Sequence, residues 1–300
     1  MKCFYSDNYS FPLPEGHPFP MHKYEDAAKH LVASNVIAAS DLIDAGLAEE
    51  ADILRVHTPA YLSAIKNGTL PPQETRRMGF PWSERLYVRA RAAVAGTIAA
   101  ITAARQDGIG CNLAGGTHHA FPDRGEGYCV LNDVAIAIRK LQADEPDIRV
   151  IIVDLDAHQG NGTNFILKED TQVYCYSMHV GANYPSRKFE GDEDIALDRF
   201  VKGEEYLGRL KSTLPATLQA FKPDLAIYLG GVDVHEDDRF GQMKLSTGDM
   251  HERDRYTMSL LRSQNLPLAT VFGGGYNKDR ALTPLLHCQT VSLAAGLAGP

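Results

Sequence analysis

The sequence predicts an α/β fold, in which one doubly wound, mostly parallel sheet is flanked by helices. Short apolar runs alternate along the whole chain with longer segments of helical periodicity. That alternation is typical of doubly wound α/β proteins. In addition, the runs at residues 150–153 and 225–228 are apolar without a polar residue at every second position. Such runs are expected of parallel strands that helices cover on both faces.

Six segments are predicted as strands and five as helices. The strands are residues 2–5, 111–114, 149–154, 172–177, 224–229 and 267–272, and the helices are residues 24–38, 83–105, 131–143, 204–220 and 247–262. Ser83 is the expected N-cap of the second helix, because its hydroxyl can accept a hydrogen bond from a backbone amide of the first turn. No linker, repeat or low-complexity segment interrupts the pattern, so residues 1–300 are expected to form a single domain.

Composition and charge narrow the classes of partner. The chain has 30 Lys and Arg against 38 Asp and Glu, a formal net charge of −8. This charge gives no attraction to nucleic acid or to an anionic membrane, so we expect neither as a partner. If a protein segment is the substrate, the net charge favours a cationic, lysine-rich segment over an acidic one.

The ends of the chain and its cysteines indicate a compartment. The first residues lack the apolar core of a signal peptide, and no stretch reaches the length of a membrane span. The cysteines number five and include no CxxC pair. We therefore expect reduced, mostly buried cysteines in a cytoplasmic protein. A monomer is the expected oligomeric state.

Polar side chains gather where five of the predicted strands end. These clusters are Gly115-Gly-Thr-His118-His119, Asp154-Leu-Asp156-Ala-His158-Gln-Gly-Asn161, Ser177-Met178-His179, Gly231-Val-Asp233 and Gly273-Gly-Gly-Tyr276-Asn. In open parallel sheets, sites form just beyond the carboxyl ends of the strands. We therefore expect the five clusters to converge on one crevice.

Within these clusters, Asp156, His158 and Asp233 suit a zinc ion. Residues 154, 156 and 158 are spaced by two, so an extended backbone points them to the same side. Two carboxylates and one imidazole leave one coordination position open for water, which is the arrangement of a catalytic zinc site. Alone, each of these residues could equally be a hydrogen-bonded loop residue. Their joint occurrence with a histidine pair favours the metal site.

The remaining clusters suggest proton transfer and stabilisation of an oxyanion. His118 and His119 follow two glycines, which would let a substrate approach closely. A surface loop could also carry such a pair. Tyr276 follows three glycines at a strand end, where a phenol could donate a hydrogen bond to a developing oxyanion. Taken alone, the triple glycine would indicate only a flexible turn.

These motifs occur in the same order as in the zinc-dependent histone deacetylase family of the arginase/deacetylase superfamily, which the chain resembles along essentially its whole length. The resemblance implies one catalytic zinc ion held by Asp156, His158 and Asp233. It also implies that His119 is the general base and that His118 is a supporting residue, proton-donating or electrostatic, hydrogen-bonded to Asp154. Tyr276 would polarise the scissile carbonyl.

The resemblance further implies a structural potassium ion and a tunnel for the lysine side chain. The positions that match the potassium ligands are Asp154, Asp156, His158, Ser177 and Met178. The positions that match the tunnel walls are Gly127, Tyr128, Cys129, Tyr184 and Gly274.

One position departs from the commonest family members. Asn161 stands where those members have an aspartate beside the second histidine, and this wording is closer to the class IV branch and its bacterial relatives. A neutral amide orients His119 without holding it as an imidazolium, so we expect a lower pKa for His119 than a carboxylate partner would give.

The resemblance implies a hydrolase that removes acyl groups, long-chain ones among them, from acylated lysine in peptides or proteins. An acetylpolyamine or another small acylated amine is the alternative substrate. The chain carries no large insertion, and its only long irregular stretches near the N-terminal half are residues 12–20 and 69–82. Polyamine amidohydrolases tend to carry extra loops, so lysine is the preferred prediction.

Three rival classes fit less well. A two-metal hydrolase of the arginase type would need a carboxylate where this chain has Gly160. A binding module with a relict pocket would not need the complete set of ligands, histidines and tyrosine. A dinucleotide-binding protein would need GxGxxG after the first strand, and residues 5–9 contain no glycine.

Overall fold

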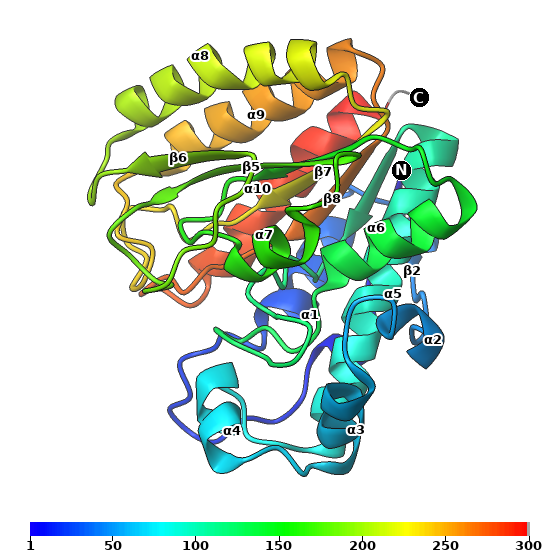
Figure 1. Cartoon of the computed structure of the whole chain (residues 1–300). Helices are drawn as coiled ribbons and strands as arrows, with labels where there is room; N and C mark the ends of the chain where they lie inside the picture. Colours follow the sequence, from blue (N-terminus) through cyan, green and yellow to red (C-terminus); the bar gives the residue numbers. More distant parts are fainter. Residues whose placement is uncertain (299–300) are drawn as a thin grey trace.

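The centre of the molecule is one eight-stranded sheet with all neighbouring strands parallel, in a computed structural model that describes residues 1–298 (Figure 1). The strand order is β2-β1-β3-β8-β7-β4-β5-β6. The strands are β1 Lys2–Phe4, β2 Leu42–Ile43, β3 Ile109–Asn112, β4 Val150–Asp154, β5 Val173–Val180, β6 Glu193–Leu197, β7 Leu225–Gly230 and β8 Leu268–Phe272. The predicted fold class is confirmed.

Helices cover both faces of the sheet (Figure 1). They are α1 Lys23–Ala33, α2 Glu50–Ile53, α3 Pro59–Asn67, α4 Pro72–Met78, α5 Glu84–Asp107, α6 Asp133–Asp144, α7 Asn161–Leu167, α8 Gly203–Phe221, α9 Thr247–Ser263 and α10 Leu282–Leu297. One layer consists of α8, α9, α10 and α1, which contact their neighbours in that order, and the other contains α5, α6 and α7. The short helices α3 and α4 lie away from the sheet, at the bottom of the view.

All six predicted strands and all five predicted helices are present, with shifted ends. Ser83 caps α5 as predicted, since its Oγ accepts a hydrogen bond from Leu86 N at 3.2 Å. The first helix ends at Ala33 instead of residue 38, because Asn35 adopts a left-handed conformation with φ of 56°. The third strand lies two residues earlier than predicted. β5 continues to Val180 because β6 pairs with its second half.

Two strands and several helices of the structure were not predicted from the sequence. β6 is an edge strand that is mostly half-buried, so it has no continuous apolar run. β2 has only two residues. α10 was missed although it is 16 residues long, and α4 lies within residues 69–82, which were expected to be irregular.

Within residues 1–298, one helix, α5, is long and apolar enough to cross a membrane by length and composition alone. Within its most apolar window, 72% of the residues are buried in the molecule. It packs against β3, β8 and α6. Burial of this extent is typical of the core helix of a globular fold.

The strand order brings the polar clusters together. β7 pairs with β4 on one side and with β8 on the other. All strands point the same way, so the loops that follow these three strands lie side by side at the carboxyl edge of the sheet. β4 and β7 are buried along their whole length, so this edge is rigidly placed.

Candidate active site

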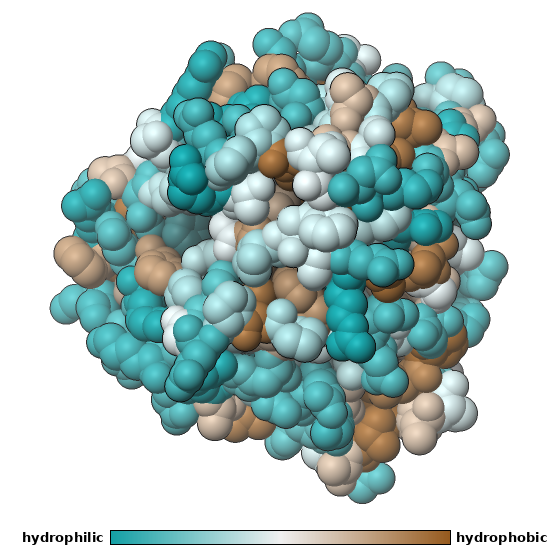
Figure 2. Space-filling model, turned by 90° about the horizontal axis from the view of Figure 1, so that it is seen from below, coloured by the Kyte–Doolittle hydropathy of each residue, from teal (hydrophilic) through white to brown (hydrophobic). Residues whose placement is uncertain are grey.

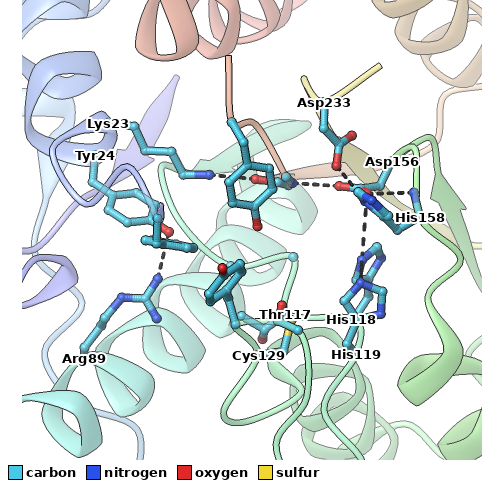
Figure 3. Close-up of a pocket in the computed structure, with 18 residues that line it drawn as sticks. Lys23, Tyr24, Arg89, Thr117, His118, His119, Cys129, Asp156, His158 and Asp233 are labelled. Atoms are coloured by element: carbon cyan, nitrogen blue, oxygen red, sulfur yellow. Dashed lines mark hydrogen bonds and ion pairs between the residues drawn. The ribbon is translucent and has the colours of Figure 1, made fainter. Parts of the chain in front are cut away.

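Three of the predicted side chains meet at one point: Asp156 and His158, which follow β4, and Asp233, which follows β7. His158 Nδ1 lies 3.1 Å from Asp156 Oδ1 and 2.9 Å from Asp233 Oδ2. One potential ligand atom from each residue lies within 4.8 Å of the others, and all three residues are buried (Figure 3). Among residues 1–298 this is the one such group of His, Cys, Asp and Glu. We call these three residues the metal group, because they could hold one metal ion.

The chemistry of the metal group fits a divalent cation. Burial and the negative charge of Asp156 raise the pKa of Asp233 to about 7, since two carboxylates this close repel each other away from water. A cation between the two carboxylates would remove that repulsion. Two carboxylate oxygens and one imidazole nitrogen are ligands that zinc accepts in proteins.

Backbone amides fix the two carboxylates. Ala157 N donates to Asp233 Oδ1 at 2.9 Å, and Gly274 N donates to Asp156 Oδ2 at 2.7 Å. A Cβ atom at position 274 would collide with the carboxylates of both aspartates. The predicted tunnel residue Gly274 therefore lies against the metal group, where only glycine fits.

A buried arginine on α9 joins the two loops that carry the metal group. Arg253 Nη1 donates to the backbone oxygens of Leu155 at 3.1 Å and of Gly231 at 2.8 Å, just before the two aspartates. Its Nε donates to Asp254 Oδ1 at 2.7 Å, so its charge is balanced. The sequence analysis missed Arg253, because a lone arginine within a helical pattern is usually exposed.

The two histidines form one hydrogen-bonded chain. His118 Nδ1 lies 2.7 Å from Asp154 Oδ2, and the Nε2 atoms of His118 and His119 are 3.1 Å apart. His119 Nδ1 donates to Asn161 Oδ1 at 2.7 Å. The predicted pairs, His118 with Asp154 and His119 with Asn161, are therefore both present. Donation from Nδ1 leaves Nε2 of His119 as the basic nitrogen.

The surroundings separate the pKa values of the two histidines. Burial would lower the pKa of His118, but the charges of Asp154 and Asp156 outweigh it and raise this pKa to about 9. Burial, together with the charges of His118 and His158, lowers the pKa of His119 well below its usual value. Near neutral pH, His119 is therefore the neutral member of the pair and His118 the charged member.

Tyr276 borders the same space from the loop after β8. Its backbone is fixed, because its N–H donates to Asp238 Oδ2 at 2.6 Å and its carbonyl accepts from Arg239 Nε at 3.0 Å. Its hydroxyl makes no hydrogen bond to any of residues 1–298. Burial, with the charges of Asp233 and Asp156, raises the pKa of the phenol well above its usual value. The hydroxyl therefore keeps its proton and is free to donate a hydrogen bond to a ligand.

An inner cavity of about 40 Å³ lies beside the metal group. Tyr276 borders it, and the metal group and the histidine pair lie on one side. On the other side are the buried cations Lys23 and Arg89 and the ring of Tyr24 (Figure 3). Lys23 Nζ donates to the carbonyl of Gly273 at 2.9 Å, and Arg89 Nη2 donates to the Tyr24 hydroxyl at 2.7 Å. Neither cation could be assigned to the site from the sequence, because both lie on helices far from the motifs.

A wider outer pocket of about 380 Å³, which we call the mouth, joins this region to the surface. The predicted tunnel residues Gly127, Tyr128 and Tyr184 border it. The Tyr184 ring stands edge-on to the His119 ring, with the two centroids 5.0 Å apart. A Cβ atom at position 127 would lie 2.8 Å from the His119 ring, so glycine is needed there. The other predicted wall residue, Cys129, borders the inner cavity.

The residues predicted to hold potassium are all buried and lie around the end of β4. The sheet register sets Asp154 beside Ser177. Met178 follows on β5, and the backbone at 154–158 leads into the metal group. The structure thus brings all five positions together, and the potassium ion stays a prediction.

Comparison with known proteins identifies similar chains. A family model described as "Histone deacetylase domain" matches residues 17–290. Histone deacetylase 2 of Arabidopsis thaliana is 30% identical over 294 residues, which cover 94% of this chain and 76% of the relative. Acetoin utilization protein AcuC of Staphylococcus aureus is 28% identical over 297 residues, covering 91% and 76%. An uncharacterized protein of Picosynechococcus sp. is 41% identical over 275 residues, covering 92% of each chain.

Solved structures share the fold. The crystal structure of an HDAC homolog complexed with SAHA matches with a TM-score of 0.81 at 23% sequence identity. That match covers 100% of this chain and 84% of the other. The HD domain of HDA15 matches with a TM-score of 0.80 at 21% identity, covering 100% and 91%.

Proposed function

The chain belongs to the histone deacetylase family, and on that premise we propose that it hydrolyses the amide bond of acylated lysine side chains in peptides or proteins. The observation that carries the proposal is the meeting of three features at one small cavity. These are the metal group, a histidine pair with separated pKa values, and a tyrosine hydroxyl without a protein partner.

We assign the metal group to a single zinc ion. Zinc supplies Lewis acidity and lowers the pKa of water to about 7. The proposal also includes a structural potassium ion near Asp154 and Ser177.

The side chains of the site divide the remaining work. His119 accepts a proton from the attacking water at Nε2, its basic nitrogen. Asp154 orients His118 through the 2.7 Å contact. The protonated His118 supplies the proton that the leaving amine requires. Tyr276 donates its hydroxyl hydrogen bond to the substrate oxygen that gains negative charge. The products are a carboxylate and a free amine.

The size of the inner cavity supports a short acyl group. Its volume of about 40 Å³ holds only a few groups of the size of water. The long-chain acyl groups that the sequence analysis allowed would need considerably more room. A small acylated amine stays the second candidate, because the tyrosines at the mouth would flank any linear amine.

The test is a substrate panel with metal analysis. We expect one zinc ion per chain, loss of activity on chelation, and recovery when zinc is returned. The quantity to compare is kcat/KM, because that ratio measures discrimination between transition states. Among acetyl-lysine peptide, myristoyl-lysine peptide and acetylputrescine, it should be highest for the first. Full activity of the stripped protein would contradict the metal assignment. A higher kcat/KM for acetylputrescine would contradict the lysine assignment.

A further inference from the structure

The mouth has a charge opposite to that of the whole molecule. The chain carries a formal net charge of −8, yet the described side chains that border the mouth include Arg76, Arg77 and Arg239 and no aspartate or glutamate. Figure 2 views the molecule from the side on which α4 lies in Figure 1, and hydrophilic residues cover most of this face. Three cations around one entrance raise the local concentration of anionic ligands.

Two of the arginines extend from α4 and are exposed. Arg77 Nη1 lies 3.1 Å from Glu74 Oε1 on the same helix, so part of its charge is balanced. Arg76 makes no ion pair or hydrogen bond to any of residues 1–298. Its guanidinium is therefore available to a ligand at the mouth.

The third arginine is held in place by backbone groups. Arg239 Nε donates to the carbonyl of Tyr276 and its Nη2 to the carbonyl of Pro18, both at 3.0 Å. Two carbonyls fix the guanidinium without neutralising its charge. The neighbouring Asp238 is half-buried, and its carboxylate accepts hydrogen bonds from three backbone amides, so it is already engaged within the chain.

One further carboxylate stands near the entrance and is already engaged. Glu126 accepts a hydrogen bond from the Tyr184 hydroxyl at 3.2 Å and lies 3.7 Å from Arg124 Nε. Lys188 lies in the segment that follows Tyr184 and does not border the mouth itself, and its Nζ donates to the backbone oxygens of Asn183 and Pro185. The loops around the mouth therefore leave an excess of positive charge.

We infer that the acyl-lysine substrate lies in an acidic segment of a peptide or protein, an inference that rests on the proposed function. Residues next to the lysine in an extended segment follow one another at about 3.3 Å, so side chains one or two positions away reach the mouth. Guanidinium groups bind carboxylates with paired hydrogen bonds. The same charges repel the free ammonium of an acylated polyamine. The mouth thus favours an acidic segment, whereas the net charge of the chain suggested a lysine-rich one.

The experiment assays the zinc-loaded protein with three acetyl-lysine peptides of equal length. The residues on both sides of the lysine are aspartate in the first peptide, serine in the second and lysine in the third. We expect kcat/KM for the aspartate peptide to exceed that for the lysine peptide by on the order of tenfold at low salt. The ratio should approach one as salt rises from about 0.01 M to about 1 M, where the screening length falls from about 30 Å to about 3 Å.

A matched pair of variants locates the effect. Arg76→Glu should reduce the aspartate-to-lysine ratio severalfold. Arg209→Glu makes the same change in net charge on α8, at the opposite end of the molecule from α4 (Figure 1), and should leave the ratio unchanged.

Each outcome of this experiment decides a separate point. If the serine peptide is hydrolysed and the ratio is near one, the proposed function stands and the acidic substrate is wrong. Equal ratios for the two variants would contradict the role of the mouth. If none of the three peptides is hydrolysed, the proposed function itself fails, and the inference fails with it.

Discussion

Single atoms at the site have roles that substitution can separate, and the Tyr276 hydroxyl is the clearest case. It borders the inner cavity and makes no hydrogen bond to the described chain, so Tyr276→Phe removes no contact that folding uses. We expect turnover to fall by on the order of 10²–10³, with zinc content and the unfolding midpoint unchanged. Single-turnover rates measure this effect. Tyr256→Phe on α9 is the control and should be silent; normal turnover in Tyr276→Phe would reject the oxyanion role.

A second atom, Asn161 Oδ1, holds the imidazole of His119 without adding a charge beside it. Asn161→Asp places a negative charge where His119 Nδ1 now donates to an amide at 2.7 Å. The pKa of His119 should rise, because a nearby anion stabilises the imidazolium. A base works only when unprotonated, so the acidic limb of the kcat/KM profile should move to higher pH.

The control for this change lies on the same helix. Asn164 donates to the carbonyl of Phe189, away from the histidines. Asn164→Asp adds the same charge near the site without contacting His119. If both substitutions move the pH profile equally, the effect comes from general electrostatics and not from the Asn161–His119 pair.

At the scale of elements, α9 contacts both loops that carry the metal group through the side chain of Arg253. The guanidinium reaches the carbonyls before both aspartates, whereas a lysine ammonium could not span them while also pairing with Asp254. For Arg253→Lys we expect zinc affinity to fall by about 10- to 100-fold, the usual cost of losing a partner behind a ligand. Competition with a chelator measures it.

Arg255→Lys provides the matched control for α9. Arg255 is two residues further along, exposed, and paired only with Glu252. This variant should bind zinc as the parent does. If Arg253→Lys lowers the unfolding midpoint but keeps full zinc affinity, then Arg253 stabilises the fold without positioning the metal group.

The helices and strands also differ in how well the sequence predicts them. Apolar runs identify buried strands, and polar residues at their ends must meet because parallel strands share a carboxyl edge. The metal group and the histidine pair were predictable for that reason. α10 and β6 were not predicted, and neither were Lys23, Arg89 and the arginines of the mouth. Their places depend on tertiary packing between distant segments, which leaves no local pattern.

At the scale of the whole molecule, a buried histidine outside the site links stability to pH. His57 is 2% exposed, and its Nε2 accepts a hydrogen bond from Asn132 N at 2.9 Å. Burial lowers its pKa from 6.5 to about 4. Between these values the unfolded chain binds more protons at His57 than the folded chain does. The stability that depends on a neutral His57 is therefore fully present above pH 6.5 and decreases as pH falls towards 4. The loss is about 3 kcal/mol.

Urea unfolding of the parent and of His57→Gln across this pH range measures the link. The glutamine can still accept from Asn132 N but does not titrate, so the variant should lose less stability than the parent on acidification. The difference between the two proteins isolates His57 from other buried histidines. Parallel pH dependence in both proteins would show that His57 titrates normally in the folded state.

The position of β8 in the sheet has a consequence for synthesis on the ribosome. β8 joins the half-sheet β2-β1-β3 to the half-sheet β7-β4-β5-β6, yet it is the last strand to be translated. A nascent chain lacking β8 has two open strand edges, which are prone to pair with other chains. Contacts between such distant segments also form slowly. Because Tyr276 follows β8, catalysis begins only once the two half-sheets have closed, and we expect chaperones to shield the chain until then.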